Sequence, residues 1–174
     1  MSKMFLTNSE YLYSSFKRDI SKSPYKLLFE YAHNNIYALT TQKISVENQN
    51  ALLLHDGFVI ENGTIVYNKK NDITILEDIF QAYNANINAI RNDTLGNYVL
   101  GIFKEDVLTV FTEQSNCYDV FYYVDNDIWA ISSSLYDLVE PLKEKLSINK
   151  LNVLEWFSRH AILNDETVFN EIKR

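Results

Sequence analysis

The sequence predicts an α+β fold in which helices pack on antiparallel sheets. Between residues 25 and 67, and again between residues 96 and 134, short apolar runs alternate with polar breaks, which is typical of antiparallel strands. Between residues 72 and 83, and again after residues 134 and 149, apolar residues instead recur every three or four positions, which predicts helices. This order of elements fits layers of helix and sheet around one core.

Length and composition indicate a single domain, residues 1–174, with a sizeable core. Of the 174 residues 47% are hydrophobic and 14% aromatic, so the chain can bury enough apolar surface to fold. The net charge of −7 is dispersed and no basic block is present, which argues against a nucleic-acid partner. No apolar run reaches the roughly 18 residues of a membrane span, and no apolar signal core opens the chain. We therefore expect a cytoplasmic protein without a membrane partner.

The first half of the chain is expected to form strands. Residues 1–23 are polar with scattered aromatic side chains, and they fit either a short strand followed by a loop or a loosely attached arm. Five later runs are expected as strands: Tyr25–Phe29, Ile36–Thr40, Leu52–Leu54, Phe58–Ile60 and Thr64–Tyr67. The last two flank Asn62-Gly63, which predicts a hairpin because both residues tolerate positive φ.

Four helical segments are expected. The first runs from about Asp72 to about Tyr83, where Asp72 or Asn71 can accept hydrogen bonds from the first free amides. A further short turn is expected around Ile87 and Ile90. The remaining two segments lie after residues 134 and 149.

The helix after residue 134 carries Leu135 and Leu138, is capped by serines 132 to 134, and is limited by Pro141. The helix after Ser147 or Asn149 should bury its apolar positions. Those positions are Leu151, Leu154, Phe157, Trp156 and Ile162. Residues 167–172 are strand-like.

Residues 96–134 are expected to form the central meander of the fold. Its four strands are Tyr98–Phe103, Val107–Phe111, Val120–Val124 and Ile128–Ile131. Polar breaks at residues 105–106 and 125–127 predict tight turns. Because the runs are apolar on both faces, we expect them to lie inside a layered fold.

Five successive pieces carry a resemblance to a known family. They are Asp72–Leu76 through Tyr83, Leu95–Leu100, Leu108–Phe111 through Val120–Tyr123, Ile128–Ser133 and Glu166–Ile172. In this order they resemble the N-terminal, glutaminase-type domain of the asparagine synthetases, whose patterns include L-x-G-M-F-A-F-A-I-W, F-x-F-A-S-E-x-K-A-L and E-T-L-F-E-G-I. The resemblance implies a four-layer αββα fold of the N-terminal-nucleophile type with antiparallel sheets.

The resemblance also implies that the glutaminase chemistry is lost. In the family a cysteine directly after the initiator methionine attacks the side-chain amide of glutamine, and its own α-amino group serves as base. Position 2 is Ser2, a weaker nucleophile. The family's A-R-D-R-F-G pattern is replaced by residues 112–117, so its supporting Arg and Asp are lost at Glu113 and Gln114.

The substrate-binding positions of the family are similarly altered. Its N-G-E-I-Y-N motif supplies oxyanion donors from Asn and Gly and a glutamine-binding Glu, and it is similar to residues 62–67. The resemblance implies Asn62, Gly63, Thr64 and Asp72 as vestigial substrate-binding residues, with Thr64 in place of Glu and Asp72 in place of the Asp that holds the substrate ammonium. A hairpin turn at Asn62-Gly63 and a helix cap at Asp72 explain the same residues without a ligand.

Other reactive side chains form no recognisable site. Cys117 is the only cysteine, so no internal disulfide or cysteine metal cluster can form, and we expect a packed free thiol rather than a nucleophile. His55-Asp56 either makes a turn before Gly57 or supplies half of a triad with a distant serine. His33 is expected in a loop and His160 at a helix end. Three scattered histidines predict no metal site.

The function implied by the resemblance is that of a catalytically inactive glutamine amidotransferase-like domain. It would act as the scaffold of an asparagine synthetase-like, ATP-dependent amide-forming enzyme, as in β-lactam synthetases and lasso-peptide cyclases. The S-G-G-x-D-S loop of the synthetase is not in this sequence, so we expect no cofactor in this chain, and ATP and Mg only with a synthetase domain in cis or in trans. A peptide or an amino-acid-derived molecule would be the substrate. Two alternatives stay open, a Ser2-dependent amidohydrolase and a module that binds a peptide by strand addition.

Overall fold

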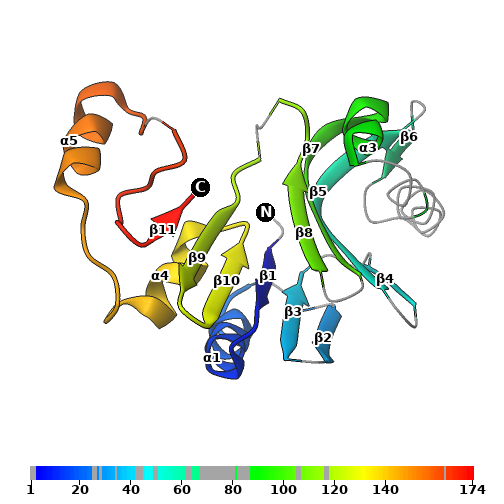
Figure 1. The fold of residues 1–174 in the computed structure, drawn as a ribbon, viewed down its shortest axis with the longest axis horizontal. Helices are drawn as coiled ribbons and strands as arrows, with labels where there is room; N and C mark the ends of the chain where they lie inside the picture. Colours follow the sequence, from blue (N-terminus) through cyan, green and yellow to red (C-terminus); the bar gives the residue numbers. More distant parts are fainter. Residues whose placement is uncertain are drawn as a thin grey trace.

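The protein is a mixed α+β structure with two antiparallel sheets, as the sequence predicts (Figure 1). The computed structural model describes residues 3–24, 27, 29–33, 35–41, 45–48, 51–61, 64–66, 81, 87–104, 107–115, 118–162 and 164–174. None of the helices within these ranges is long and apolar enough to cross a membrane.

The first sheet has six strands, and its central strands come from opposite ends of the chain. In spatial order they are β11 (Ile172–Lys173), β9 (Phe121–Asp125), β10 (Ile128–Ser132), β1 (Met4–Thr7), β3 (Ile36–Thr40) and β2 (Phe29–His33). Every neighbouring pair is antiparallel. Strand β1 therefore pairs with β3 on one side and with the distant β10 on the other.

The second sheet is built on two long strands. Its order is β4 (Ser45–Asn48), β5 (Ala51–Glu61), β7 (Thr94–Lys104) and β8 (Val107–Thr112), and β6 (Thr64–Val66) pairs with the far end of β5. Strands β5 and β7 pair antiparallel along their whole length. These two strands therefore form the centre of the sheet.

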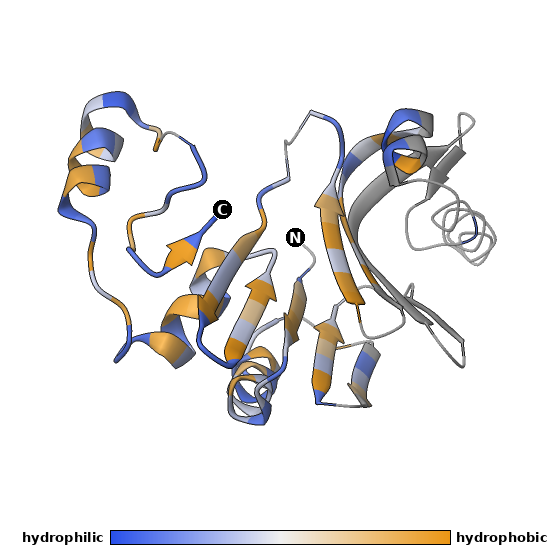
Figure 2. Ribbon diagram, viewed as in Figure 1, coloured by the Kyte–Doolittle hydropathy of each residue, from blue (hydrophilic) through white to orange (hydrophobic). Residues whose placement is uncertain are grey.

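The two sheets pack face to face, and helices cover the other face of the first sheet. Because side chains alternate along a strand, Met4 and Leu6 of β1 pack with Val99 of the second sheet, whereas Phe5 packs with Phe16 on the helix side. The helix layer consists of α1 (Glu10–Ser21) and α4 (Leu135–Leu142). Helix α3 (Ile87–Asp93) lies beside β7, on the side of the second sheet away from the first (Figure 1). In Figure 2 the apolar colour follows β10 and β8, which contribute to this interior.

The predicted central meander is wrong as a single element, because its four strands belong to two different sheets. Strands β7 and β8 form a hairpin in the second sheet, and β9 and β10 form a hairpin in the first. Within each hairpin the break is two residues long, at 105–106 and at 126–127, whereas residues 113–120 connect the two sheets. A longer polar segment has the reach to cross between layers that a two-residue turn lacks.

Residues 3–23 do not form a loosely attached arm. All four residues of β1 are buried, so the expected short strand is present at the centre of a sheet. The loop expected after it is instead the 12-residue helix α1. Ser9 caps α1 by accepting a hydrogen bond from the Leu12 amide, and Leu12, Phe16 and Ile20 face the sheet at spacings of four residues.

The other strand predictions have mixed outcomes. Strand β3 has the predicted bounds, Ile36–Thr40, but the two strands expected at 52–54 and 58–60 are parts of the single strand β5. Strand β2 begins at Phe29, where the predicted strand ends. Glu61 pairs with Thr64, as a hairpin at residues 62–63 requires, although those two residues lie outside the described residues. The helix predicted from residue 72 to residue 83 also lies outside them, apart from the helical Gln81.

The last two helices begin as predicted, and one of them is not buried. Helix α4 begins after Ser134, although the Ser134 side chain makes no capping hydrogen bond, and it continues one residue past Pro141. Helix α5 (Lys150–Arg159) begins after Asn149, whose side chain accepts a hydrogen bond from the Asn152 amide. The predicted burial of its apolar residues is wrong. They are exposed: Leu151 by 74%, Leu154 by 65%, Trp156 by 48% and Phe157 by 68%.

Candidate functional site at the start of β1

The residues predicted to form a glutaminase-like site are not brought together by the described part of the structure. Ser2, Asn62, Gly63 and Asp72 all lie outside the described residues. Thr64 is the first residue of β6, which pairs only with β5 at the edge of the second sheet. The start of β1, directly after position 2, is therefore the part of the predicted site whose surroundings can be described.

The backbone at the start of β1 is fixed from both sides. The Lys3 amide donates to Thr41 Oγ1 at 2.8 Å, and the Thr41 amide donates to the Lys3 carbonyl at 3.0 Å. On the other side the Met4 amide donates to Ser133 Oγ at 2.9 Å, and the Ser133 amide donates to the Met4 carbonyl at 3.1 Å. These four hydrogen bonds hold the chain at the point where residue 2 joins it.

A partly buried ion pair lies next to this backbone. Lys3 Nζ contacts Asp137 Oδ1 at 2.5 Å, and the Asp137 side chain, in the first turn of α4, is only 5% exposed. Ser132 Oγ donates to the other oxygen, Oδ2, at 3.4 Å. Burial raises the pKa of the Asp137 carboxyl, and the hydrogen bond and charge of Lys3 oppose that rise without cancelling it. Lys3 lies two residues before Phe5, so the pair lies on the helix side of the sheet.

The cavity beside this ion pair is too small for a substrate. Its volume is about 80 Å³, and its lining includes Lys3, Asp19, Tyr136, Asp137 and Glu140. A water molecule occupies roughly 30 Å³ of liquid, whereas ligand pockets generally span about 300–1,000 Å³. The cavity therefore has room for about two or three waters. Within the described residues no group of three or more His, Cys, Asp or Glu side chains is placed to hold a metal ion.

Glu113 organises the segment that connects the two sheets. Its side chain is buried, and Oε1 accepts hydrogen bonds from the Tyr118 amide at 3.1 Å and from Ser115 Oγ at 3.3 Å. Arg91 of α3 donates to the Glu113 carbonyl at 3.4 Å. Thus the buried carboxylate of Glu113 shapes the local turn. Cys117, four residues on, lies outside the described residues.

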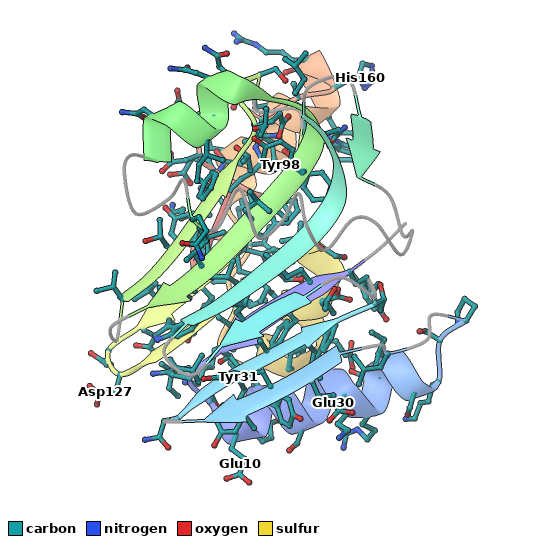
Figure 3. The ribbon with its side chains drawn as sticks, turned by 90° about the vertical axis from the view of Figure 1, so that its right-hand side faces the viewer. Glu10, Glu30, Tyr31, Tyr98, Asp127 and His160 are labelled. Carbon is teal, nitrogen blue, oxygen red and sulfur yellow. The ribbon has the colours of Figure 1, made fainter. Side chains whose placement is uncertain are left out.

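A buried tyrosine lies close to α3 on the same sheet. The hydroxyl of Tyr98 on β7 is 2.5 Å from Thr94 Oγ1, which in turn donates to the Ile90 carbonyl of α3 (Figure 3). Burial raises the pKa of Tyr98, so this phenol stays protonated at neutral pH. The arrangement joins α3 to β7, and the charges of Glu113 and Arg91 act on the phenol in opposite directions.

The histidines are placed on separate elements. His55 pairs with Leu100 in the middle of β5, so the predicted turn at His55-Asp56 is wrong. His33 ends β2 and pairs with Ile36, whereas a loop was predicted. His160 does lie at the end of α5, where it adopts φ 55° and its amide donates to the Trp156 carbonyl. The backbone positions therefore bring none of them to the start of β1.

A larger groove of about 630 Å³ lies along β9, where the two-residue strand β11 ends. Its lining includes Tyr122, Val124, Lys145, Asn170 and Lys173. The charges at its rim are paired within the chain. Lys145 lies 3.3 Å from Asp125 and Lys173 lies 2.7 Å from Glu166.

Sequence reasoning missed the residues that define this site. Lys3 was placed in a weakly patterned segment, and Asp137 was not singled out, although an acidic residue in the first turn after Ser134 is a common helix-start signal. Models of known protein families and curated proteins give no match to this chain. The fold and the site therefore define a class only, a mixed α+β protein whose first strand is central to an antiparallel sheet.

Proposed function

We propose that this chain is a catalytically inactive, glutaminase-like domain that serves as the scaffold of an asparagine synthetase-like, ATP-dependent amide-forming enzyme. The proposed fold is the four-layer αββα arrangement of the N-terminal-nucleophile type. Three features support it: two antiparallel sheets packed face to face, α1 and α4 on one outer side, and α3 beside the other sheet.

The observation that carries the proposal is the surroundings of β1. An N-terminal nucleophile needs a fixed strand start, and β1 has one, directly after position 2. The charged groups that lie there, Lys3 and Asp137, pair with each other on the helix side of the sheet. They therefore stabilise the position of the strand instead of acting on a substrate. Ser2 in place of cysteine adds a nucleophile that is weak without activation.

In this proposal the chemistry belongs to a synthetase domain in cis or in trans. That domain would use ATP and Mg to activate a carboxylate by adenylation, and an amine of the same peptide or amino-acid-derived substrate would form the amide. Such an intramolecular reaction needs no ammonia, so the glutaminase activity has no role. The present chain would contribute a rigid packing surface.

Glutamine hydrolysis by the purified chain tests the inactive assignment. We expect no glutamate release from wild type, Ser2→Ala or Ser2→Cys, because Ser2→Cys restores the thiol but not the glutamine-binding Glu that Thr64 replaces. Hydrolysis by wild type that disappears in Ser2→Ala would establish the amidohydrolase alternative. Intact-mass labelling by a glutamine-derived electrophile would then locate the adduct on Ser2.

The scaffold role is tested with a synthetase domain that carries the S-G-G-x-D-S loop. Adding the purified chain to that domain should raise its substrate-dependent pyrophosphate release, and the two should co-elute in size-exclusion chromatography. In the matched control the chain is denatured and removed before the assay, so that the synthetase domain is measured without it. Equal activity with and without the folded chain, together with separate elution, would contradict the scaffold role.

The groove along β9 supports peptide binding as a second candidate function. Strand β11 pairs with β9 only at Tyr122 and Tyr123, and the groove continues past Val124. An extended peptide could lengthen the sheet there by adding main-chain hydrogen bonds. Titration with a leader-type peptide should then shift the fluorescence of Trp129, which pairs with Val124 across β9 and β10. Val124→Asp should abolish the shift, and no shift in wild type excludes this function.

A further inference from the structure

Residues 147–171 lead away from α4, form α5 and return to the first sheet at the start of β11; we call this segment the α5 excursion (Figure 1). Its two ends are joined at the base. The Asn149 amide donates to the Val168 carbonyl at 2.9 Å, the Asn170 amide donates to the Ser147 carbonyl at 3.1 Å, and Ile148 and Phe169 form a β-bridge. The excursion is thus a closed loop whose helix lies apart from both sheets.

The inward face of α5 is held by polar contacts. Asn152 is the buried residue of the helix, and its Nδ2 donates to the Thr167 carbonyl at 2.7 Å. Thr167 Oγ1 in turn donates to the Ile172 carbonyl at 2.7 Å, which connects the helix to β11. Hydrogen bonds to the returning chain therefore hold the inward face of α5, and the apolar side chains of the helix face outward.

The outward side of the excursion is apolar over a large area. Leu151, Leu154 and Phe157 are exposed on this side, and Ile148, which directly precedes the helix cap, is 64% exposed. At roughly 150–250 Å² for a whole aromatic side chain and somewhat less for an aliphatic one, these four expose on the order of 400 Å². Patches of about 300–600 Å² are the largest on ordinary monomers and mark interaction surfaces. This patch needs a cover that the described residues do not supply.

We propose that α5 is the interface of a homodimer, in which a second copy packs antiparallel on it about a two-fold axis through Leu154. At 3.6 residues per turn, positions 150, 151, 154, 157 and 158 share one face of the helix. Across the axis Leu154 meets its own copy, Leu151 meets Phe157 of the partner subunit, and Lys150 meets Ser158 of the partner subunit. An isologous contact requires this self-complementarity. The inference goes beyond the proposed function and does not depend on it.

The charges favour a second copy as the occupant. The whole chain carries −7, so most surfaces of two copies repel each other, but the five positions on the outward face of α5 include no acidic residue. Lys150 is the one charged residue on the outward face of α5, and the two-fold axis keeps it away from its own copy. Arg159, on another side of the helix, is paired with Glu155 at 3.7 Å. Two copies can therefore approach through α5 without a net electrostatic penalty.

The area fits a weak dimer. Two copies of the patch bury on the order of 800 Å² in total, which is in the range of weak, transient interfaces. We accordingly expect a reversible dimer with a micromolar dissociation constant. Light scattering after size-exclusion chromatography, over a dilution series of the full chain, measures it.

The first test replaces the residue on the axis. Leu154→Glu places two carboxylates against each other, so dimerisation should weaken at least tenfold. Tyr11→Glu is the matched control, because Tyr11 is a 69% exposed apolar residue on α1. It should dimerise like wild type. A monomeric wild type at all concentrations, or equal dimerisation by the two variants, overturns the proposal. A synthetase domain that covers the patch instead would give the monomeric result.

A second variant keeps the proposal testable if Leu154→Glu fails to fold. Leu154→Cys is made in a Cys117→Ser background, because Cys117 is the only cysteine. Packed helices about 8–10 Å apart bring facing Cα atoms within the roughly 4.4–6.8 Å of a disulfide. Mild oxidation should therefore link Leu154→Cys as a dimer and leave Tyr11→Cys in the same background monomeric on a non-reducing gel. Equal linking of the two overturns the two-fold arrangement.

Discussion

Helices α1 and α5 are both amphipathic, but only α1 places its apolar face on a sheet. Leu12, Phe16 and Ile20 of α1 are each at most 4% exposed, and Phe16 stacks on Phe5 of β1 with ring centroids 4.4 Å apart. In α5 the buried residue is the polar Asn152, and Phe157 is 68% exposed. An apolar helical pattern therefore predicts that one face of the helix is covered, but it does not predict that a segment of the same chain covers it.

The two helices belong to regions that are stabilised in different ways. Around β1 and α1 the stability should come from buried apolar surface and a buried ion pair. In the α5 excursion it should come from hydrogen bonds between the outgoing and the returning chain. Paired substitutions in the two regions test this contrast, with the largest expected effect first.

The largest contrast is between two phenylalanines. Phe16→Ala should lower the free energy of unfolding by about 3–5 kcal/mol, because it removes a ring packed between α1 and the first sheet. Phe157→Ala should change it by no more than about 0.5 kcal/mol in the monomer, because that ring is mostly exposed. Urea denaturation at low protein concentration measures both. Similar losses would show that α5 is covered within the monomer.

The next contrast is between two lysines. Lys3→Met leaves the Asp137 carboxylate buried without its cation, and should cost about 3 kcal/mol at pH 7. Lys17→Met removes the pair with Glu30, whose two side chains are both more than 40% exposed, and should cost at most about 1 kcal/mol. Chemical denaturation compares them. A Lys3→Met variant as stable as Lys17→Met would contradict a structural role for the buried pair.

A smaller effect is expected inside the excursion. Asn152→Ala leaves the buried Thr167 carbonyl without its donor, which should cost about 1–3 kcal/mol. Asn170→Ala is the control, because its bond to Ser147 Oγ is exposed, and it should cost no more than about 0.5 kcal/mol. In hydrogen exchange, Asn152→Ala should deprotect the amides of the α5 excursion and not those of β1. Loss of protection throughout the chain would mean that the excursion does not open independently.

The smallest expected effect is a pH dependence of opposite sign in the two regions. Burial raises the pKa of Asp137, so its contribution to stability is complete below the unfolded value of about 3.9 and is lost as pH rises through the raised folded pKa. The hydrogen bond from Lys173 lowers the pKa of Glu166, so that contribution is present above about 4.3 and is lost as pH falls.

Urea unfolding of wild type, Asp137→Asn and Glu166→Gln between about pH 3 and 7 measures the direction in which each carboxyl changes the free energy of unfolding with pH. The stability of wild type relative to Asp137→Asn should fall as pH rises, and its stability relative to Glu166→Gln should increase. Parallel slopes for the two pairs would contradict the assigned environments. Circular dichroism at each pH checks that all three proteins begin folded.

Local signals in the sequence were sufficient for individual strands and helix starts. An apolar run that begins directly after Asn34-Asn35 placed β3 at Ile36–Thr40, and the side-chain oxygen of Asn149 marked the start of α5. The same kind of signal was present at Ser9, followed by Leu12, Phe16 and Ile20, yet the polar residues between them concealed α1. These features depend on neighbours within four residues.

The partners of those elements depend on residues far apart in the chain. Nothing local distinguishes a meander in one sheet from two hairpins in two sheets, except that the break at residues 113–120 is longer than the other two. The pairing of Lys3 with Asp137 spans 134 residues. The exposure of Leu154 depends on whether a distant segment covers it. Such properties follow from tertiary packing and lie beyond periodicity.

The position of β1 between β3 and β10 has a consequence for folding. The pair of β1 and β3 joins residues about thirty positions apart, whereas Phe5 meets its partner Ser132 only after more than a hundred further residues have been made. Contacts of such long sequence separation slow folding, since the loop must close before they form. During synthesis we expect β1 and β3 to form a two-stranded ribbon in which the other edge of β1 is apolar and unpaired. This edge exposes the nascent chain to aggregation until β10 is made and pairs with it.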